Sequence, residues 1–400
     1  MKYTLKDHID KSFERLCQNN YLINDLLNGD GNWPGDWEGR ALLAFCSLYS
    51  CCGKKATAMD EFIKRIDEIL NEEGFVGDVF NPDAVNEQQL SGNGWFLSAL
   101  CEYYKLFGDE KILAIAKNVF NNLFYAALPA YDVYPLDPRT KEDGGVGGHN
   151  FEIKNGWILS TDVGCAFIGV DGVSRYYELT KDEKAKEFME KTADKFLEVD
   201  KLKVKAQTHA TLTASRAYFR FYKATGDKKY FDIAKDHFEL YIKEGMTLNY
   251  ENFNWFKRKD TWTEPCAVTD SVILAIWFYN ETKDESYKTL ARRIWFNGLS
   301  NSHRDNGGAG PNKCVYEDNP YLSVFMYEAH FCCTMRYPEG LKYIFDNAEM
   351  FENGEGEITT DEIGRKFNGD ILIVTDEEGK EHLLSDLAFL PNEGKKYTVF

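Results

Sequence analysis

Apolar residues recur at three- and four-residue spacing along most of the chain, a pattern typical of amphipathic helices. Segments 212–222 and 230–241 form one pair of this kind, segments 40–50 and 60–70 form another, and 329–350 continues the pattern. The spacing predicts about six helical hairpins. Strand-like alternation is nearly absent before residue 355.

An internal repeat marks the turns of these hairpins. A tyrosine is followed five residues later by an aspartate, and in three of the four copies an alanine comes seven residues after the aspartate. Each copy predicts helix, short turn, helix, in which Gly or Lys ends the first helix and Asp caps the second. The copies are Tyr104/Asp109, Tyr177/Asp182, Tyr222/Asp227 and Tyr279/Asp284, with the alanines Ala116, Ala234 and Ala291.

Helical hairpins in series form either an open solenoid or a closed ring. The copies lie 73, 45 and 57 residues apart, and this irregular spacing argues against a solenoid. We therefore expect an all-α (α/α)6 barrel over residues 1–352. In the remainder, 353–400, the run DILIVTDEEGKEHLL predicts a strand, an acidic turn and a second strand. We expect this short β-containing tail to pack on the barrel.

Long connections separate the hairpins, and they are rich in Gly, Asn, Trp, Tyr and Asp. Loops of this length in a compact domain are usually functional or disordered, and the aromatic content favours function. Aromatic faces suit the apolar faces of sugar rings. The longest are 28–37, 78–93, 132–157, 246–264 and 302–321.

The strongly negative net charge of the chain bears on which molecules it can bind. A formal net charge of −18 argues against nucleic acid, whose binders carry basic faces, so a neutral carbohydrate fits better. No stretch reaches the roughly 18 apolar residues that span a bilayer, and the first residues lack the apolar core of a signal peptide. We expect a cytoplasmic protein without a membrane partner. Its ten cysteines are then core residues, metal ligands or reactive thiols.

Two short segments carry the most specific chemistry. In TEPCA, Pro265 suits the first turn of a helix, so that Glu264 and Cys266 could point to one side. In FCC, Cys332 and Cys333 can share one metal only near a helix end or in a loop, because adjacent helical residues diverge by about 100°. One carboxylate and three thiolates form a tetrahedral zinc set. The alternative is that the cysteines are small buried core residues.

These segments resemble those of the β-L-arabinofuranosidases that use a cysteine nucleophile held on zinc, a family with a Glu-x-Cys motif, a later Cys-Cys pair and an (α/α)6 barrel. TEPCA is similar to the first motif and AHFCC to the second; segments 207–227 and 90–109 look like two of the family's helices. The resemblance covers roughly residues 30–350. Gly94-Trp95 stands where the family has Gly-His, so the sugar need not be L-arabinofuranose.

The resemblance implies a role for each matching residue. Glu264, Cys266, Cys332 and Cys333 would bind Zn2+, and Cys332 would also be the nucleophile. Glu251, in YENFNW, matches the family's acid/base glutamate, although it lies closer to Glu264 than the family pattern suggests. His209 would be a substrate-contacting histidine.

The implied chemistry is that of a retaining glycoside hydrolase. Zinc would ionise a thiol that is otherwise mostly protonated at neutral pH. Cys332 would attack the anomeric carbon while Glu251 protonates the leaving oxygen, and water would then release the sugar. Glu251 needs a raised pKa for this, and we expect the flanking Tyr250, Phe253 and Trp255 to raise it by desolvation.

Further candidates for substrate contact lie in the loops. Trp33, Asp36 and Trp37 begin a predicted helix and could form a sugar platform; the alternative is a helix cap with packed tryptophans. Trp255, in the loop that carries Glu251, is a separate candidate. His149 ends the glycine-rich segment 144–152, where the backbone could approach a ligand.

Two other classes of function remain open. A sugar epimerase or isomerase would use His149 and His209 as a proton-transfer pair without zinc, and a non-catalytic carbohydrate-binding protein would cleave no glycoside. The sequence leaves the oligomeric state undetermined.

Overall fold

The computed structural model describes residues 3–139, 148–352, 354–389 and 394–400. Contacts divide the chain into two compact units. The early unit comprises residues 19–46 and 55–241, and the late unit comprises 1–18, 47–54 and 242–400. The predicted boundary at residue 352 falls inside the late unit, and the division into 1–352 and 353–400 stays a prediction.

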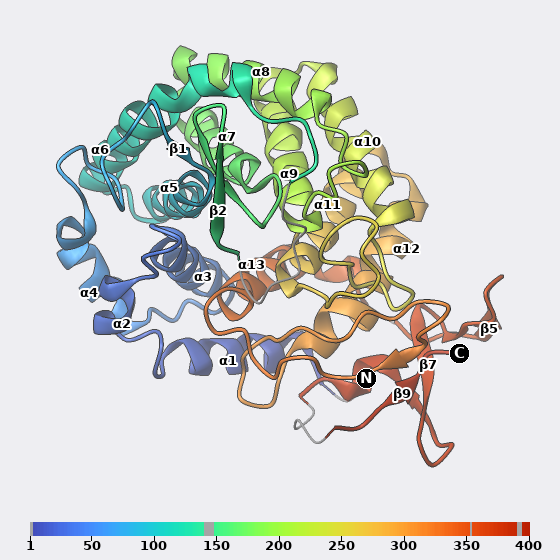
Figure 1. Cartoon of the computed structure of the whole chain (residues 1–400). Coiled ribbons are helices and arrows are strands. Elements are labelled where there is room, and N and C mark those ends of the chain that lie inside the picture. Colours follow the sequence, from blue (N-terminus) through green and yellow to red (C-terminus); the bar gives the residue numbers. More distant parts are fainter. Residues whose placement is uncertain (1–2, 140–147, 353, 390–393) are drawn as a thin grey trace. The chain divides into compact units, whose positions relative to one another are not determined.

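Three long helices form the interior of the early unit and pack side by side (Figure 1): α5 (Glu87–Phe107), α7 (Gly169–Thr180) and α9 (Thr208–Thr225). Most of their residues are buried, as expected for helices covered on several sides. Helices α6 (Glu110–Val119), α8 (Glu183–Glu198) and α10 (Lys228–Glu244) each bury one face. Also in the chain are α2 (Ile23–Asn28), α3 (Asp36–Cys52) and α4 (Thr57–Arg65).

Helices α5 and α7 approach each other closely because glycines face one another. A Cβ on Gly94 would lie 2.4 Å from the Cα of Gly169, and a Cβ on Gly172 would lie 2.5 Å from the carbonyl oxygen of Gly94. Such distances exclude any larger side chain without a backbone shift. Gly94 is therefore required by helix packing.

The predicted hairpin turns are confirmed, and the repeat has a hydrogen-bonding explanation. The turn residues Gly108, Lys181, Gly226 and Lys283 have left-handed backbones, and each donates its N–H to the carbonyl of the repeat tyrosine, at 2.7–2.9 Å. Each repeat aspartate then accepts from the backbone N–H two residues later, at 2.9–3.0 Å. The tyrosine carbonyl thus closes one helix and the aspartate begins the next.

A small sheet in the early unit corrects the expectation that strands are nearly absent before residue 355. Strands β2 (Asn150–Lys154) and β3 (Trp157–Ser160) form an antiparallel hairpin, and β1 (Val85–Asn86) pairs parallel to β3. Asn155 and Gly156 both have positive φ, 52° and 77°. An Asn-Gly pair of this kind makes the tight turn that favours a two-residue hairpin.

The late unit joins helices from distant parts of the chain. Helix α11 (Pro265–Thr282) packs against α12 (Glu285–Arg293) and α13 (Cys333–Asp346), and α13 also packs against α1 (Leu5–Leu16). A buried histidine pair links α1 to the rest of the unit: His8 Nδ1 lies 2.8 Å from His303 Nδ1 and 3.0 Å from the Tyr337 hydroxyl.

The tail contributes most of a second sheet, larger than the expected hairpin. Its strands run in the order β4-β9-β7-β6-β5, with β8 paired to β7 as the predicted hairpin. The bounds are β4 (Tyr321–Leu322), β5 (Ile358–Thr360), β6 (Lys366–Asn368), β7 (Ile371–Asp376), β8 (Glu381–Leu383) and β9 (Tyr397–Thr398). In the described residues, no helix is both long and apolar enough to cross a membrane.

Candidate active site

The three candidate cysteines meet where two packed helices begin. Cys266 is the second residue of α11, after Pro265 in the first turn, while Cys333 begins α13 and Cys332 is its N-cap. Their sulfur atoms all lie within 4.8 Å of one another. Cys332 has a non-helical backbone, φ −149° and ψ −66°. This break lets two neighbouring thiols point to the same place.

A buried ion pair holds the two helix starts together. Arg336 on α13 donates from Nη2 to the Asp270 carboxylate on α11 at 2.6 Å, and both side chains are completely buried. Each residue lies about one helical turn beyond its cysteine. The ion pair therefore fixes the register in which the thiols meet.

The thiol cluster has the spacing of a zinc site. The sulfur of Cys333 lies 3.7 Å from that of Cys266 and 3.3 Å from that of Cys332. Two sulfurs bound tetrahedrally to one zinc at about 2.3 Å would lie about 3.8 Å apart. Burial raises the pKa of the Cys333 thiol well above its ordinary value, so these thiols need a cation to ionise. The donor set therefore fits Zn2+.

Glu264 lies beside the cluster and has its own support. A carboxylate oxygen of Glu264 lies within 4.8 Å of the Cys266 sulfur. The Glu264 backbone N–H donates to Asn252 Oδ1 at 2.7 Å. With its amide oriented to satisfy both neighbours, Asn254 donates to Glu264 Oε2 at 2.8 Å and accepts from Trp262 Nε1 at 3.1 Å. These contacts orient the carboxylate.

The three cysteines differ in their exposure to solvent. Cys266 and Cys333 are 0 % and 2 % exposed, whereas Cys332 is half-buried. A reactant arriving from solvent can therefore reach the sulfur of Cys332 more readily than that of the other two.

Glu251 is a completely buried carboxyl in a network of neutral donors. Its Oε2 accepts from Asn249 Nδ2 at 2.7 Å, and its Oε1 accepts from Asn312 Nδ2 at 2.8 Å and from the Thr263 hydroxyl at 3.3 Å. Burial raises the pKa of Glu251 to about 7, although these donors and the charge of Arg304 favour the ionised form. At neutral pH the carboxyl is thus divided between its two protonation states.

The expected desolvation by aromatic neighbours is consistent with this environment. Phe253 and Trp255 are buried beside Glu251 in the chain, and so is Tyr250, whose backbone has a φ of 65°. The side chains that bond to Glu251, however, come from Asn249, Thr263 and Asn312.

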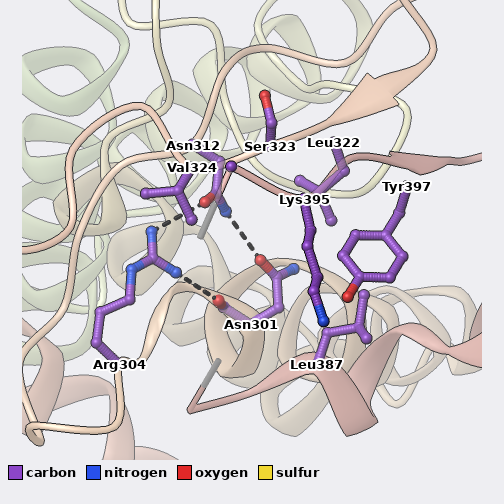
Figure 2. A pocket seen from close by; sticks show the side chains of 10 residues that line it. Asn301, Arg304, Asn312, Leu322, Ser323, Val324, Leu387, Lys395 and Tyr397 are labelled. Atoms are coloured by element: carbon purple, nitrogen blue, oxygen red, sulfur yellow. Dashed lines mark hydrogen bonds between the residues drawn. The ribbon is translucent and has the colours of Figure 1, made fainter. Parts of the chain in front are cut away.

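The residues that connect to Glu251 through Asn312 were not identified from the sequence. Arg304, Asn301 and Asn312 line a cavity of about 50 Å3, shown in Figure 2 with Tyr397 and Lys395 of the tail. A volume of this size holds a few water molecules and no sugar. A small signal did exist, since Asn249, Asn252 and Asn254 cluster within one short loop.

The candidate substrate-binding residues at the start of α3 contact other residues of the early unit. Trp33 Nε1 donates to the Gly148 carbonyl at 3.2 Å, and Trp37 Nε1 donates to the Asn20 carbonyl at 3.3 Å. Asp36 forms a 2.6 Å ion pair with Arg40. The tryptophan contacts agree with the packing part of the alternative, and both a cap and a role in substrate binding stay predictions.

The two candidate histidines also belong to the early unit. The His209 ring on α9 stacks on Trp95, with centroids 5.8 Å apart. His149 is half-buried just before β2, and its backbone pairs with Thr161. Residues 144–147 of the glycine-rich segment lie outside the described residues.

Comparison with solved structures shows the fold. Similar structures include the cellobiose 2-epimerase of Bacillus thermoamylovorans B4167 (TM-score 0.54, 15 % identity, 86 % of this chain and 100 % of that one). Another is the α-1,6-mannanase GH76A of Salegentibacter sp. HEL1_6, with a TM-score of 0.55 and 14 % identity over 87 % of this chain and 100 % of that one. A third is an unsaturated glucuronyl hydrolase specific for heparin, with a TM-score of 0.55 and 12 % identity over 86 % of this chain and 98 % of that one. The predicted six-hairpin (α/α)6 fold, with a small C-terminal sheet, is confirmed.

The fold and the family comparison together define a glycoside hydrolase. Residues 136–344, about half of the chain, match the family described as "Beta-L-arabinofuranosidase, GH127 catalytic domain". The chain belongs to this family, which confirms the resemblance seen in the sequence. The matched range contains Glu251 and all four candidate zinc ligands. Among curated proteins, none matches the chain in sequence.

Proposed function

We propose that this glycoside hydrolase is a retaining enzyme with Cys332 as nucleophile and Glu251 as acid/base, and that Zn2+ is held by Glu264, Cys266, Cys332 and Cys333. The observation that carries the proposal is the convergence of three thiols, with a carboxylate beside Cys266, at the starts of α11 and α13. When bound, zinc would supply the positive charge that keeps these thiols ionised.

The chain's own residues would perform two displacements. In the first, the Cys332 sulfur bonds to the anomeric carbon as the glycosidic C–O bond breaks, and Glu251 gives its proton to the leaving oxygen. In the second, water attacks the same carbon, Glu251 takes a proton from that water, and the C–S bond breaks. A carboxyl with a pKa of about 7 suits both directions of transfer. Glu251 is fully buried, so the proposal requires a bound substrate to displace part of its cover.

The substrate we propose is a furanoside or a related neutral glycoside, similar to a β-L-arabinofuranoside. The family match favours this sugar class, and the net charge of −18 disfavours polyanionic glycans.

Metal analysis and a glycoside panel test the proposal together. We expect one zinc per chain in the purified protein and cleavage of at least one aryl furanoside, with loss of both after chelation. A zinc-free protein that interconverts sugars would support the epimerase alternative instead. A protein that binds glycans but cleaves no glycoside of the panel would support the non-catalytic alternative.

The acid role of Glu251 has its own signature. Glu251→Gln should lower kcat/KM for a substrate with a poor leaving group by roughly 10²- to 10⁴-fold and that for an activated aryl leaving group much less, because kcat/KM reports the first displacement, in which only the former needs a proton. Asn249→Ala, which removes one donor to the same carboxyl, is the control for a general structural effect. Equal losses on both leaving groups in Glu251→Gln would remove the acid assignment.

A further inference from the structure

Arg304 is a buried cation that forms no ion pair with a carboxylate in the described part of the chain. The Arg304 residue is only 3 % exposed to solvent. Nε donates to the Tyr327 carbonyl and Nη1 to the Asn301 carbonyl, both at 2.9 Å. Nη2 donates to the Gly310 carbonyl at 2.7 Å and to Asn312 Oδ1 at 2.9 Å. Among the described residues, no carboxylate forms an ion pair with it. Burying such a charge is costly unless a compensating charge lies nearby.

Asn312 connects this cation to the Glu251 carboxyl. Its Oδ1 accepts from Arg304, while its Nδ2 donates to Glu251 Oε1 at 2.8 Å and to Asn301 Oδ1 at 2.9 Å. Figure 2 shows the Asn312 amide between Arg304 and Asn301. Because both ends of the amide are engaged, its orientation is fixed. An amide polarised by a cation at its oxygen is a stronger donor at its nitrogen.

The backbone reinforces the same connection. The Asn312 N–H donates to the Thr263 hydroxyl at 2.9 Å, and that hydroxyl donates to Glu251 Oε1 at 3.3 Å. Both routes from segment 310–312 therefore end on the same carboxyl oxygen. The Arg304 guanidinium is held by the carbonyls of this segment, so its charge has a fixed position relative to Glu251.

We propose that Arg304 is a positioning residue of the reaction, which acts through the Asn312 side chain to hold Glu251 between its acid and base forms. The proposal rests on the proposed function, in which Glu251 must both give and take a proton. It explains why an arginine held by backbone carbonyls and an amide oxygen lies next to the acid/base network.

The sign of the effect follows from the charges that act on Glu251. Burial raises its pKa, and the positive charge of Arg304 lowers it again. Cys314 is also coupled to Glu251: burial raises the pKa of the Cys314 thiol above its ordinary range, and the charge of Glu251 adds to that rise. Removing the Arg304 charge should therefore raise the Glu251 pKa further.

Two Arg304 variants separate charge from structure. In Arg304→Gln the alkaline limb of kcat/KM, which reports loss of the acid form, should move to higher pH by roughly one unit. Arg304→Lys keeps the positive charge but replaces the planar guanidinium by an ammonium group. The alkaline limb of its kcat/KM profile should therefore stay near that of the wild type, even if the protein is less stable. Arg292→Gln is a matched control, because its ion pair with Asp370 lies outside this network. Identical limbs in Arg304→Gln and the wild type would show that Arg304 does not act on the reaction through the acid form of Glu251.

A direct titration makes the test independent of turnover. The carboxyl band of Glu251 can be followed by infrared difference spectroscopy, with Glu251→Gln as the blank. We expect its midpoint to move to higher pH in Arg304→Gln and also in Asn312→Leu, which cuts the link but keeps both charges. An unmoved midpoint in both variants overturns the role of Arg304. If the titration midpoint of Glu251 moves but the alkaline limb of kcat/KM does not, Arg304 does act on Glu251 through Asn312. In that case Glu251 is not the acid of the reaction.

Discussion

Cys332 differs from Cys266 and Cys333 in backbone conformation and in exposure. It caps α13 with a non-helical backbone and is half-buried, while Cys266 and Cys333 are buried within the starts of their helices. A ligand that must also react needs both a fixed position and an open side. The structure supports this combination at Cys332.

Replacing this sulfur tests the nucleophile assignment. Cys332→Ser should lower kcat by roughly 10³-fold or more, because serine is a far weaker nucleophile at neutral pH. Circular dichroism should stay unchanged, and part of the zinc should remain because Glu264, Cys266 and Cys333 are intact.

A second cysteine gives a matched control for that experiment. Cys52 is also half-buried, and its thiol donates to the Leu48 carbonyl, a bond that a serine hydroxyl can replace. Cys52→Ser should keep full activity. Full activity in Cys332→Ser would show that another group attacks the sugar.

At the residue level, the sequence predicted the thiols and missed their support. Glu264, Cys266, Cys332 and Cys333 stand in short, unusual motifs, so they could be selected from one sequence. Arg304 and Asn312 are common residues in an irregular loop. The role proposed for them depends on the contacts of Asn312 with Thr263 and Glu251, which are 49 and 61 positions away. Local patterns do not encode such contacts.

At the level of elements, each hairpin turn combines two capping devices. A left-handed residue closes the first helix, and an aspartate accepts from the first turn of the second. Because these devices are local, the sequence predicted the turns correctly. The β2–β3 hairpin was missed, although its Asn155-Gly156 turn is also local, because both strands are short. Helix α5 begins inside the expected loop 78–93, where Asn86 caps it.

The capping contribution can be measured in the early unit. Asp182→Ala removes the acceptor for Lys184 N–H and should lower the free energy of unfolding by about 0.5–2 kcal/mol. Asp236→Ala, an exposed position inside α10, is the control and should change it little. Urea titrations of both variants would check this. Equal losses in the two would show that the aspartate acts through charge and not as a cap.

At the level of the whole molecule, buried neutral histidines make stability depend on pH. Burial lowers the pKa of His8 and of His237 to about 3, and that of His303 well below its ordinary value. In the unfolded chain these rings take up protons near pH 6.5. Between pH 6.5 and about 3 the unfolded state therefore binds more protons, and stability falls as the pH falls.

The size of this effect can be tested at one histidine. Each ring contributes a slope of up to about 1.4 kcal/mol per pH unit in that window. His8→Phe places an apolar ring among Trp295, Tyr337 and Phe389, and should make the dependence of unfolding free energy on pH shallower between pH 6.5 and 5. His382→Asn, at a half-buried position in the tail, is the comparison. An unchanged slope in His8→Phe would contradict the explanation.

The division into units also has a kinetic consequence. The early unit comes from two stretches separated by only eight residues, whereas the late unit must gather residues 1–18 and 242–400 from opposite parts of the chain. Closing so long a loop is entropically slow. The packing of α1 on α13, the helix that begins at Cys333, is thus completed late in synthesis and refolding. Oxidants present before that time would compete with the proposed metal for the thiols, so yields of active enzyme should depend on reductant and zinc in the refolding buffer.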